Sequence, residues 1–161
     1  MDSSTITYFL IGLMTALFLF TSDIPDTGIQ PLDYVLRSFY HGNPYHLLAN
    51  MYTFIQLSSL ATTMPPTEWL TLLLFLLVTS SLILFLIHTT LPTTKRPTIG
   101  FSAVLFGLLV LVQRFTGDSL LSISKDNILE ILPQFFVPGI SFWGHLSGII
   151  SGLIYLLING K

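Results

Sequence analysis

The sequence contains no cysteine and few charged residues. Without cysteine it has no disulfide framework, no thiolate nucleophile and no Cys-based zinc or iron–sulfur site. Its 6 Lys and Arg residues against 8 Asp and Glu give a net charge of −2, which does not supply the clustered basic face of a nucleic-acid-binding protein. We therefore expect no nucleic-acid partner. Charged residues make up 9% of the chain, whereas a soluble domain has about 25%. This excludes a water-soluble globular protein.

Hydrophobic residues, in contrast, make up 52% of the 161 residues. Because about 20 apolar residues cross a bilayer as a helix, a chain of this length holds about six crossings at most. We therefore predict an all-α membrane protein that forms one domain over residues 1–161. The six crossings are expected at about residues 6–20, 45–62, 69–88, 100–112, 128–139 and 142–158.

Polar and turn-forming segments separate these crossings. We expect loops over residues 21–44, 89–98 and 115–127, and a short fifth crossing because Pro133 and Pro138 interrupt it. A cleaved signal peptide is the alternative for residues 6–20, but no Lys or Arg precedes that segment and no A-x-A-like site follows it. The basic residues fall three to each side of the membrane, so they do not predict the orientation. They are Arg114, Lys125 and Lys161 on one side, and Arg37, Lys95 and Arg96 on the other.

The segment Gly100-Phe101-Ser102-Ala103 places a hydroxyl at the start of the fourth predicted crossing. A serine in a membrane helix usually bonds to a carbonyl of its own helix. Ser102, however, follows a glycine and a proline-containing loop, at a point where the first N–H groups of a helix have no intrahelical partner. Such N–H groups are able to bind an anion.

Small residues recur at four-residue spacing on two of the predicted crossings. They are Gly144, Gly148 and Gly152 on the last crossing, and Ala103 and Gly107 on the fourth. Small residues at this spacing let two membrane helices approach closely, which would bring His145 toward Ser102. In the alternative interpretation the glycines only pack and His145 bonds a neighbouring carbonyl. A histidine inside a crossing is energetically expensive, so a functional role is the default hypothesis.

A third polar cluster opens the second predicted crossing. His46 and Asn50 are four residues apart and share one helix face, so both side chains could donate hydrogen bonds to one point. A zinc site that includes His41 is the alternative, but no acidic residue lies nearby and Asn is a poor zinc ligand.

Together the three segments supply a nucleophile, a base and oxyanion donors, which is the minimum set for acyl transfer. No buried Asp or Glu is evident to orient His145, which indicates a dyad and not a triad. This chemistry needs no metal and no other cofactor.

These three segments resemble the motifs of the rhomboid intramembrane serine proteases, in the same order along the chain. The segment from His41 to Asn50 is similar to the H-x4-H-x3-N motif, residues 100–103 are similar to the G-x-S-G motif, and residues 144–152 are similar to the G-H-x2-G-x3-G motif. Gly100-Phe101-Ser102 together with residues 141–145 looks most like the eukaryotic endoplasmic-reticulum rhomboids. The resemblance therefore implies a compact six-helix bundle in the endoplasmic reticulum or another endomembrane.

The resemblance also implies a role for individual residues. Ser102 would be the nucleophile, His145 the general base, and His46, Asn50 and the backbone amide of Ser102 the oxyanion hole. Phe106 would stack on the imidazole of His145, and His41 and Gly100 would be accessory residues. The sequence departs from the family at Ala103, where the motif usually has Gly, and in the first loop, which lacks a Trp-Arg pair.

The resemblance further implies substrates that cross the lipid bilayer once. Such substrates have a small residue at the cleaved bond and helix-weakening residues nearby. The competing hypothesis is a non-catalytic rhomboid-like protein that binds membrane clients, although such relatives typically lose the serine or the histidine that this chain keeps. A transporter subunit is a third hypothesis, and it would require ionisable residues along a path between crossings. The sequence leaves the substrate and the oligomeric state open.

Overall fold

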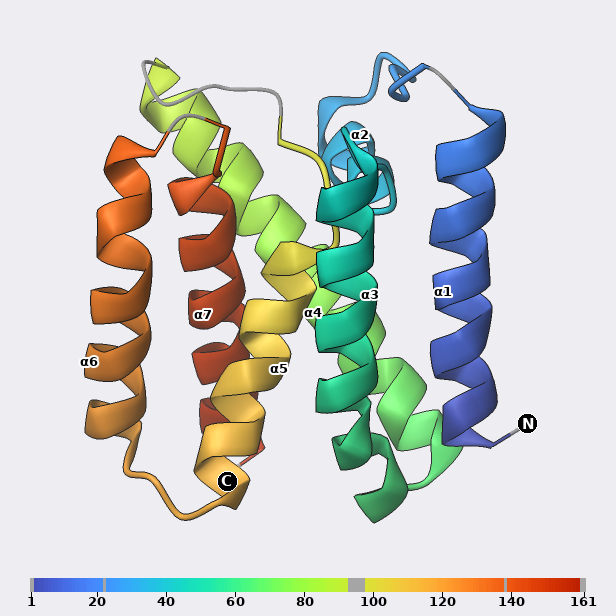
Figure 1. Cartoon of the computed structure of the whole chain (residues 1–161). Coiled ribbons are helices and arrows are strands. Elements are labelled where there is room, and N and C mark those ends of the chain that lie inside the picture. The colour runs from blue at the N-terminus through green and yellow to red at the C-terminus, as the bar shows by residue number, and fades with distance from the viewer. Residues whose placement is uncertain (1, 22, 93–97, 138, 160–161) are drawn as a thin grey trace.

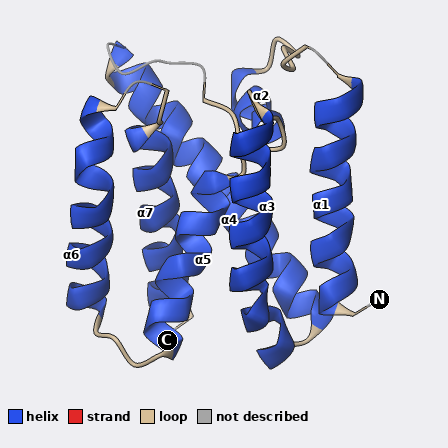
Figure 2. Cartoon of the chain, viewed as in Figure 1, coloured by secondary structure: helices blue, strands red, loops and turns tan. Residues whose placement is uncertain are grey.

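The computed structural model describes residues 2–21, 23–92, 98–137 and 139–159 (Figure 1). Lys95, Arg96, Pro138 and Lys161 lie outside these residues. Within them the chain forms helices and connecting segments and no strand (Figure 2), which confirms the all-α prediction. The α-helices are α1 (Ser3–Phe20), α2 (Gln30–Arg37), α3 (Pro44–Leu57), α4 (Pro66–Thr90), α5 (Ser102–Phe115), α6 (Leu120–Ile131) and α7 (Phe142–Ile158), and 3-10 turns follow α3 at Ser58–Thr63 (η1) and α6 at Leu132–Phe136 (η3).

Two of these helices are long and apolar enough to cross a membrane by length and composition. They are α1 and α4, whereas α5 and α7 are apolar but shorter. The helix α5 has 14 residues and is therefore about 21 Å long, less than the roughly 30 Å hydrocarbon core. The number of crossings is thus not given by helix length alone.

The structure differs from the sequence-based expectation in two loops. Residues 21–44 contain the helix α2, and residues 115–127 contain the start of α6. The fifth predicted crossing, 128–139, was therefore wrong in position, because α6 begins at Leu120 and gives way to η3 after Ile131. The polar residues at the start of α6 are typical of a loop, so the sequence did not predict a helix there. The buried face of this helix consists of Ile123, Asn127 and Ile131 at four-residue spacing.

The helices α5 and α7 pack most closely at glycines. A Cβ atom added to Gly148 would lie 2.0 Å from the carbonyl oxygen of Ala103, and one added to Gly152 would lie 2.7 Å from that of Gly107. The two backbones therefore touch at these glycines, which leave no space for a Cβ atom. A Cβ atom on Gly144 would instead meet Ser141 and Thr98, so this glycine leaves room for the segments that lead into the two helices.

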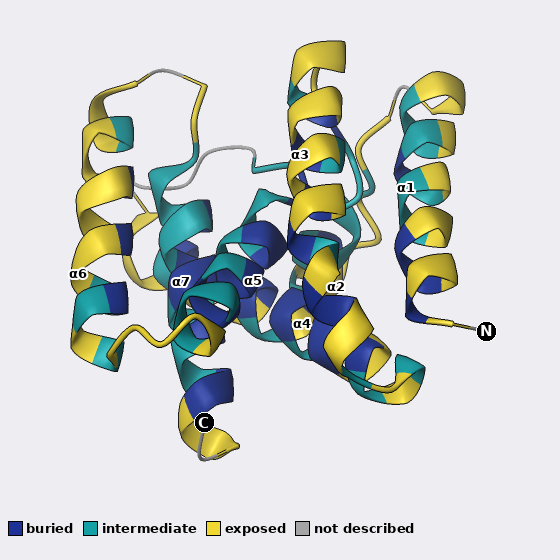
Figure 3. Cartoon of the chain, turned by 60° about the horizontal axis from the view of Figure 1, so that its bottom comes forward, coloured by how far each residue is buried: buried dark blue, intermediate teal, exposed yellow. Residues whose placement is uncertain are grey.

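The buried core is formed mainly by the three central helices, α4, α5 and α7. Dark-blue segments concentrate on α4, α5 and α7, whereas α1, α3 and α6 expose much of their outer faces (Figure 3). An aromatic cluster joins the outer helices to this core: Phe101 packs on Phe39 and Phe54, and Phe54 stacks on Trp69. The indole Nε1 of Trp69 donates to Thr7 Oγ1 at 3.2 Å, which ties α4 to α1.

The helix α5 begins inside the bundle and not at its end. The segment before it descends from the upper end of the bundle between its neighbours, and α5 then continues to the lower end (Figure 1). Phe101 anchors this segment with a fully buried ring, and the Gly100 N–H donates to the Arg37 carbonyl at 3.2 Å. Irregular backbone at such a depth is stable only where it is buried in protein or lines a cavity.

Candidate active site

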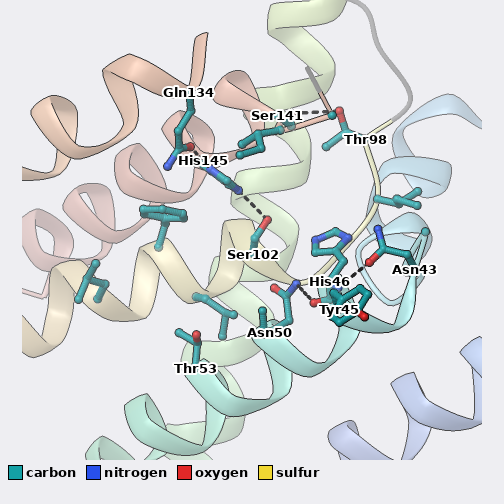
Figure 4. A pocket seen from close by; sticks show the side chains of 18 of the residues that line it. Asn43, Tyr45, His46, Asn50, Thr53, Thr98, Ser102, Gln134, Ser141 and His145 are labelled. Carbon is teal, nitrogen blue, oxygen red and sulfur yellow. Dashed lines mark hydrogen bonds between the residues drawn. The ribbon is translucent and has the colours of Figure 1, made fainter. Parts of the chain in front are cut away.

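A cavity of about 830 Å³ lies in front of the start of α5. Its wall comes from α3, α5, the end of α6, η3 and the start of α7, and it is mostly apolar. Ser102, His145, His46 and Asn50 all line it. The close-up shows these four side chains gathered around one space, with His46 and Asn50 on the side of Ser102 that faces away from His145 (Figure 4).

Ser102 and His145 form a hydrogen bond between two helices. Ser102 Oγ lies 3.0 Å from His145 Nε2, within the range for proton transfer. Ser102 is the first residue of α5, so its backbone N–H belongs to the group that has no acceptor within the helix. His145 lies in the first turn of α7, which Ser141 caps by accepting a hydrogen bond from the Gly144 N–H at 3.0 Å.

Two further contacts fix the imidazole of His145. The ring of Phe106, one turn after Ser102 on α5, lies against it with centroids 4.4 Å apart and an interplanar angle of 31°. On the other ring nitrogen, Gln134 Oε1 lies 2.5 Å from His145 Nδ1. Both nitrogens of the imidazole are therefore engaged, one with Ser102 and the other with Gln134.

Gly100 makes room for His46. It has a φ of +110°, and a Cβ atom at this position would lie 2.5 Å from His46 Cε1 and 2.7 Å from His46 Nε2. Only glycine combines this backbone angle with this contact. The ring of His46 thus lies directly against the backbone that leads into Ser102.

The helix α3 presents His46 and Asn50 on its first turns. Asn43 caps the helix by accepting a hydrogen bond from the His46 N–H at 2.8 Å, and Pro44 occupies the first helical position. The Asn50 side-chain amide donates to the His46 carbonyl at 2.8 Å. An amide nitrogen carries two N–H groups, so one remains for a ligand in the cavity.

His41 lies beside this cluster and outside the helices. Its buried ring packs edge-on against the ring of His46, with centroids 5.0 Å apart. Burial, reinforced by the neighbouring His46, lowers the pKa of His41 to about 4, so that the ring is neutral near pH 7. Among the described residues no group of three or more His, Cys, Asp or Glu is placed to hold a metal ion.

Sequence reasoning missed Gln134 as a partner of His145. The sequence offers no buried Asp or Glu to orient His145, and the prolines at 133 and 138 mark this segment as an interruption of a crossing. The signal in the sequence was a single amide side chain in the otherwise apolar segment Leu132–Phe136. In the structure Gln134 is half-buried, whereas Phe135 and Phe136 are exposed.

Comparisons with known proteins agree with the motifs. A family model described as "Rhomboid domain" matches residues 29–161. The chain is 37% identical over 153 residues to the "Putative rhomboid protein L523" of Acanthamoeba polyphaga mimivirus, covering 95% of this chain and 90% of that protein. It is 32% identical over 142 residues to the "Rhomboid-like protein 14, mitochondrial" of Arabidopsis thaliana and 28% identical over 137 residues to the "Rhomboid-related protein 4" of Mus musculus. These matches cover 78% and 75% of this chain but only 42% and 44% of the two relatives.

Proposed function

The chain belongs to the rhomboid family, and we propose that it is an intramembrane serine protease that hydrolyses peptide bonds in or near the membrane helices of other proteins. The observation that carries this proposal is the 3.0 Å contact between Ser102 Oγ and His145 Nε2 at the edge of a cavity inside the bundle. Most serines in membrane helices bond to a carbonyl of their own helix. A contact with a histidine of another helix supports a chemical role for Ser102.

The residues around the cavity supply each step of acyl transfer. Ser102 Oγ attacks the scissile carbonyl carbon while His145 Nε2 takes the hydroxyl proton, and His145 then gives this proton to the departing amine. Water enters the polar side of the cavity, loses a proton to His145 and attacks the ester carbon. The bond to Ser102 Oγ then breaks, His145 gives the proton to this oxygen, and the second product leaves as a carboxylic acid. The backbone N–H of Ser102, the ring of His46 and the free N–H of Asn50 donate to the oxyanion in both halves of the reaction. No cofactor is needed.

The proposal includes six membrane crossings in one domain. They are α1, α3 with η1, α4, α5, α6 with η3, and α7. The start of α1 and the end of α7 lie at the same end of the bundle (Figure 1), as an even number of crossings requires. The short α5 fits this arrangement because the segment before it enters the bundle from the other end and covers the remaining depth.

Substrates of this protease would be proteins with a single membrane helix. The carbonyl to be attacked must be free of its helical hydrogen bond, so we expect cleavage near a small residue with helix-weakening residues beside it. We place the protease in the endoplasmic reticulum or another endomembrane, which rests on the motif resemblance alone. One relative carries "mitochondrial" in its name, and imaging of the tagged chain against organelle markers distinguishes these membranes.

Labelling with a fluorescent fluorophosphonate tests the proposal. This probe reacts with an activated serine, so the purified parent in detergent should label covalently, and Ser102→Ala and His145→Ala should not label. Thermal unfolding of all three proteins checks that they are folded. A folded parent that does not label, but still captures a membrane protein as Ser102→Ala does, would refute the protease and favour a client-binding rhomboid-like protein.

A further inference from the structure

The imidazole of His145 has a neutral partner on the side away from Ser102. Gln134 Oε1 lies 2.5 Å from His145 Nδ1, and His145 Nε2 lies 3.0 Å from Ser102 Oγ. The three side chains form one line from Gln134 through His145 to Ser102 (Figure 4). A carboxylate, Glu130, also lines the cavity, but the hydrogen bonds described for the imidazole of His145 are those with Gln134 and Ser102.

The chemistry of the two contacting atoms decides which nitrogen carries the proton. A side-chain amide oxygen only accepts hydrogen bonds, so its partner Nδ1 must be the protonated nitrogen of the neutral ring. Nε2 then has the free lone pair, and that lone pair faces the hydroxyl of Ser102. The opposite tautomer would place a proton between Nε2 and Ser102, where it would prevent His145 from acting as a base.

The backbone of Gln134 is held in position by contacts that do not involve His145. It lies in η3, where its carbonyl accepts the Val137 N–H at 3.1 Å. The adjacent Phe135 packs edge-on against Phe142 and Trp143, which immediately precede the glycine and histidine of α7. This aromatic contact holds η3 against the first turn of α7. Because His145 lies in that turn, the amide of Gln134 lies beside the imidazole of His145.

From this geometry we propose that Gln134 is a positioning residue that holds His145 in the Nδ1-protonated tautomer and accepts from the imidazolium that forms when Ser102 gives up its proton. The proton from Ser102 goes to Nε2 and then to the leaving amine, while the Nδ1 proton stays on His145 throughout. The inference rests on the proposed protease function. It replaces the dyad expected from the sequence with a chain of three residues whose third member is uncharged.

The test is the rate of fluorophosphonate labelling in variants of the full-length chain. Gln134→Leu keeps most of the side-chain volume but removes the acceptor, so the maximal labelling rate should fall about 10- to 100-fold, as for a lost hydrogen bond to a charged group. The probe concentration at half-maximal rate should stay within about twofold, since the contact acts through His145 and not on the probe. Gln134→Glu, which keeps an acceptor at the same reach, should label within about threefold of the parent. Gln56→Leu, the same exchange at an exposed position of α3, serves as the matched control.

The outcomes separate this inference from the protease proposal. If the parent labels and Gln134→Leu labels at the same maximal rate, the positioning role is refuted and the protease stands. Equal loss in folded Gln134→Leu and Gln134→Glu also refutes it, because a role that needs a donor or only the native amide would then explain the data. A parent that does not label refutes the protease itself. If Gln134→Leu does not fold, Gln134→Met provides a flexible side chain of similar volume without the acceptor.

Discussion

Gly100 links the backbone of the serine segment to the ring of His46. Its φ of +110° and the 2.5 Å distance from an added Cβ to His46 Cε1 mean that two separate requirements meet at one residue. The first is a backbone angle that L-residues rarely adopt, and the second is space for the imidazole. A substitution at Gly100 therefore disturbs His46, the proposed oxyanion donor, without replacing Ser102 or His145.

We predict that Gly100→Ala lowers the maximal rate of fluorophosphonate labelling by at least about tenfold, because a displaced His46 no longer donates to the oxyanion. The backbone strain should also cost about 1–3 kcal/mol of stability. Gly117→Ala is the matched control, since Gly117 has a φ of +105° and nothing within 4 Å of an added Cβ. If both variants lose labelling equally, backbone strain and not the contact with His46 is responsible.

The residues of the candidate site differed in how well the sequence predicted them. Ser102 and His145 were predicted to approach each other because small residues at four-residue spacing indicate where two helices can touch. His46 and Asn50 share a helix face by spacing alone. Gln134 could not be placed, because the path from it to His145 passes from a 3-10 turn through a loop into α7, and no periodic pattern spans such a change.

At the scale of elements, the contact between α5 and α7 sets the distance between Ser102 and His145, the proposed nucleophile and base. The carbonyl of Ala103 lies where a Cβ of residue 148 would be, and Ala103 follows Ser102 directly. The helix α6, in contrast, packs its buried face through Ile123, Asn127 and Ile131, and Asn127 donates to the side chain of Gln113 on α5. The helices that carry Ser102 and His145 thus meet through their backbones, whereas α6 contacts α5 through side chains.

Gly148→Ala should force α5 and α7 apart. We expect a loss of about 1–3 kcal/mol or more from overpacking, measured as a lower midpoint of thermal unfolding, together with slower fluorophosphonate labelling. Gly12→Ala on α1 is the control, because an added Cβ at Gly12 meets nothing within 4 Å and alanine favours a helix over glycine by about 0.5–1 kcal/mol. An unchanged midpoint in Gly148→Ala would contradict the tight contact.

The start of α6 shows why element boundaries were harder to predict than element types. Its first turns carry serines, a lysine and an aspartate, which are typical of a loop, yet Ser119 caps the helix by accepting the Ser122 N–H at 3.2 Å. Ile123, Asn127 and Ile131 face the core, whereas Lys125 and Asp126 are exposed. A search for uninterrupted apolar runs finds the lipid-facing helices and misses amphipathic ones such as α6 and α2.

For the whole molecule, the absence of natural cysteine permits a direct test of the six crossings. Single cysteines at exposed positions of the connections can be labelled with a membrane-impermeant maleimide in sealed vesicles. We expect Asp2→Cys, Thr62→Cys and Thr116→Cys to react from one side, and Asp26→Cys and Ile140→Cys from the other. Detergent-solubilised protein, in which all five should react, is the control. Labelling of Asp2→Cys and Thr116→Cys from opposite sides would contradict six crossings.

The backbone contact between α5 and α7 also bears on how such a chain can change over evolutionary time. Where two helices meet through glycine and carbonyl groups, there is no side chain that a substitution could shorten, lengthen or re-shape. Substitutions are therefore better tolerated on the outer faces of the bundle, where a side chain of different shape does not push two backbones apart. The spacing of Ser102 and His145 thus follows from the path of the backbone, and a substitution on an outer face leaves it unchanged as long as Gly148 and Gly152 keep the two helices in contact.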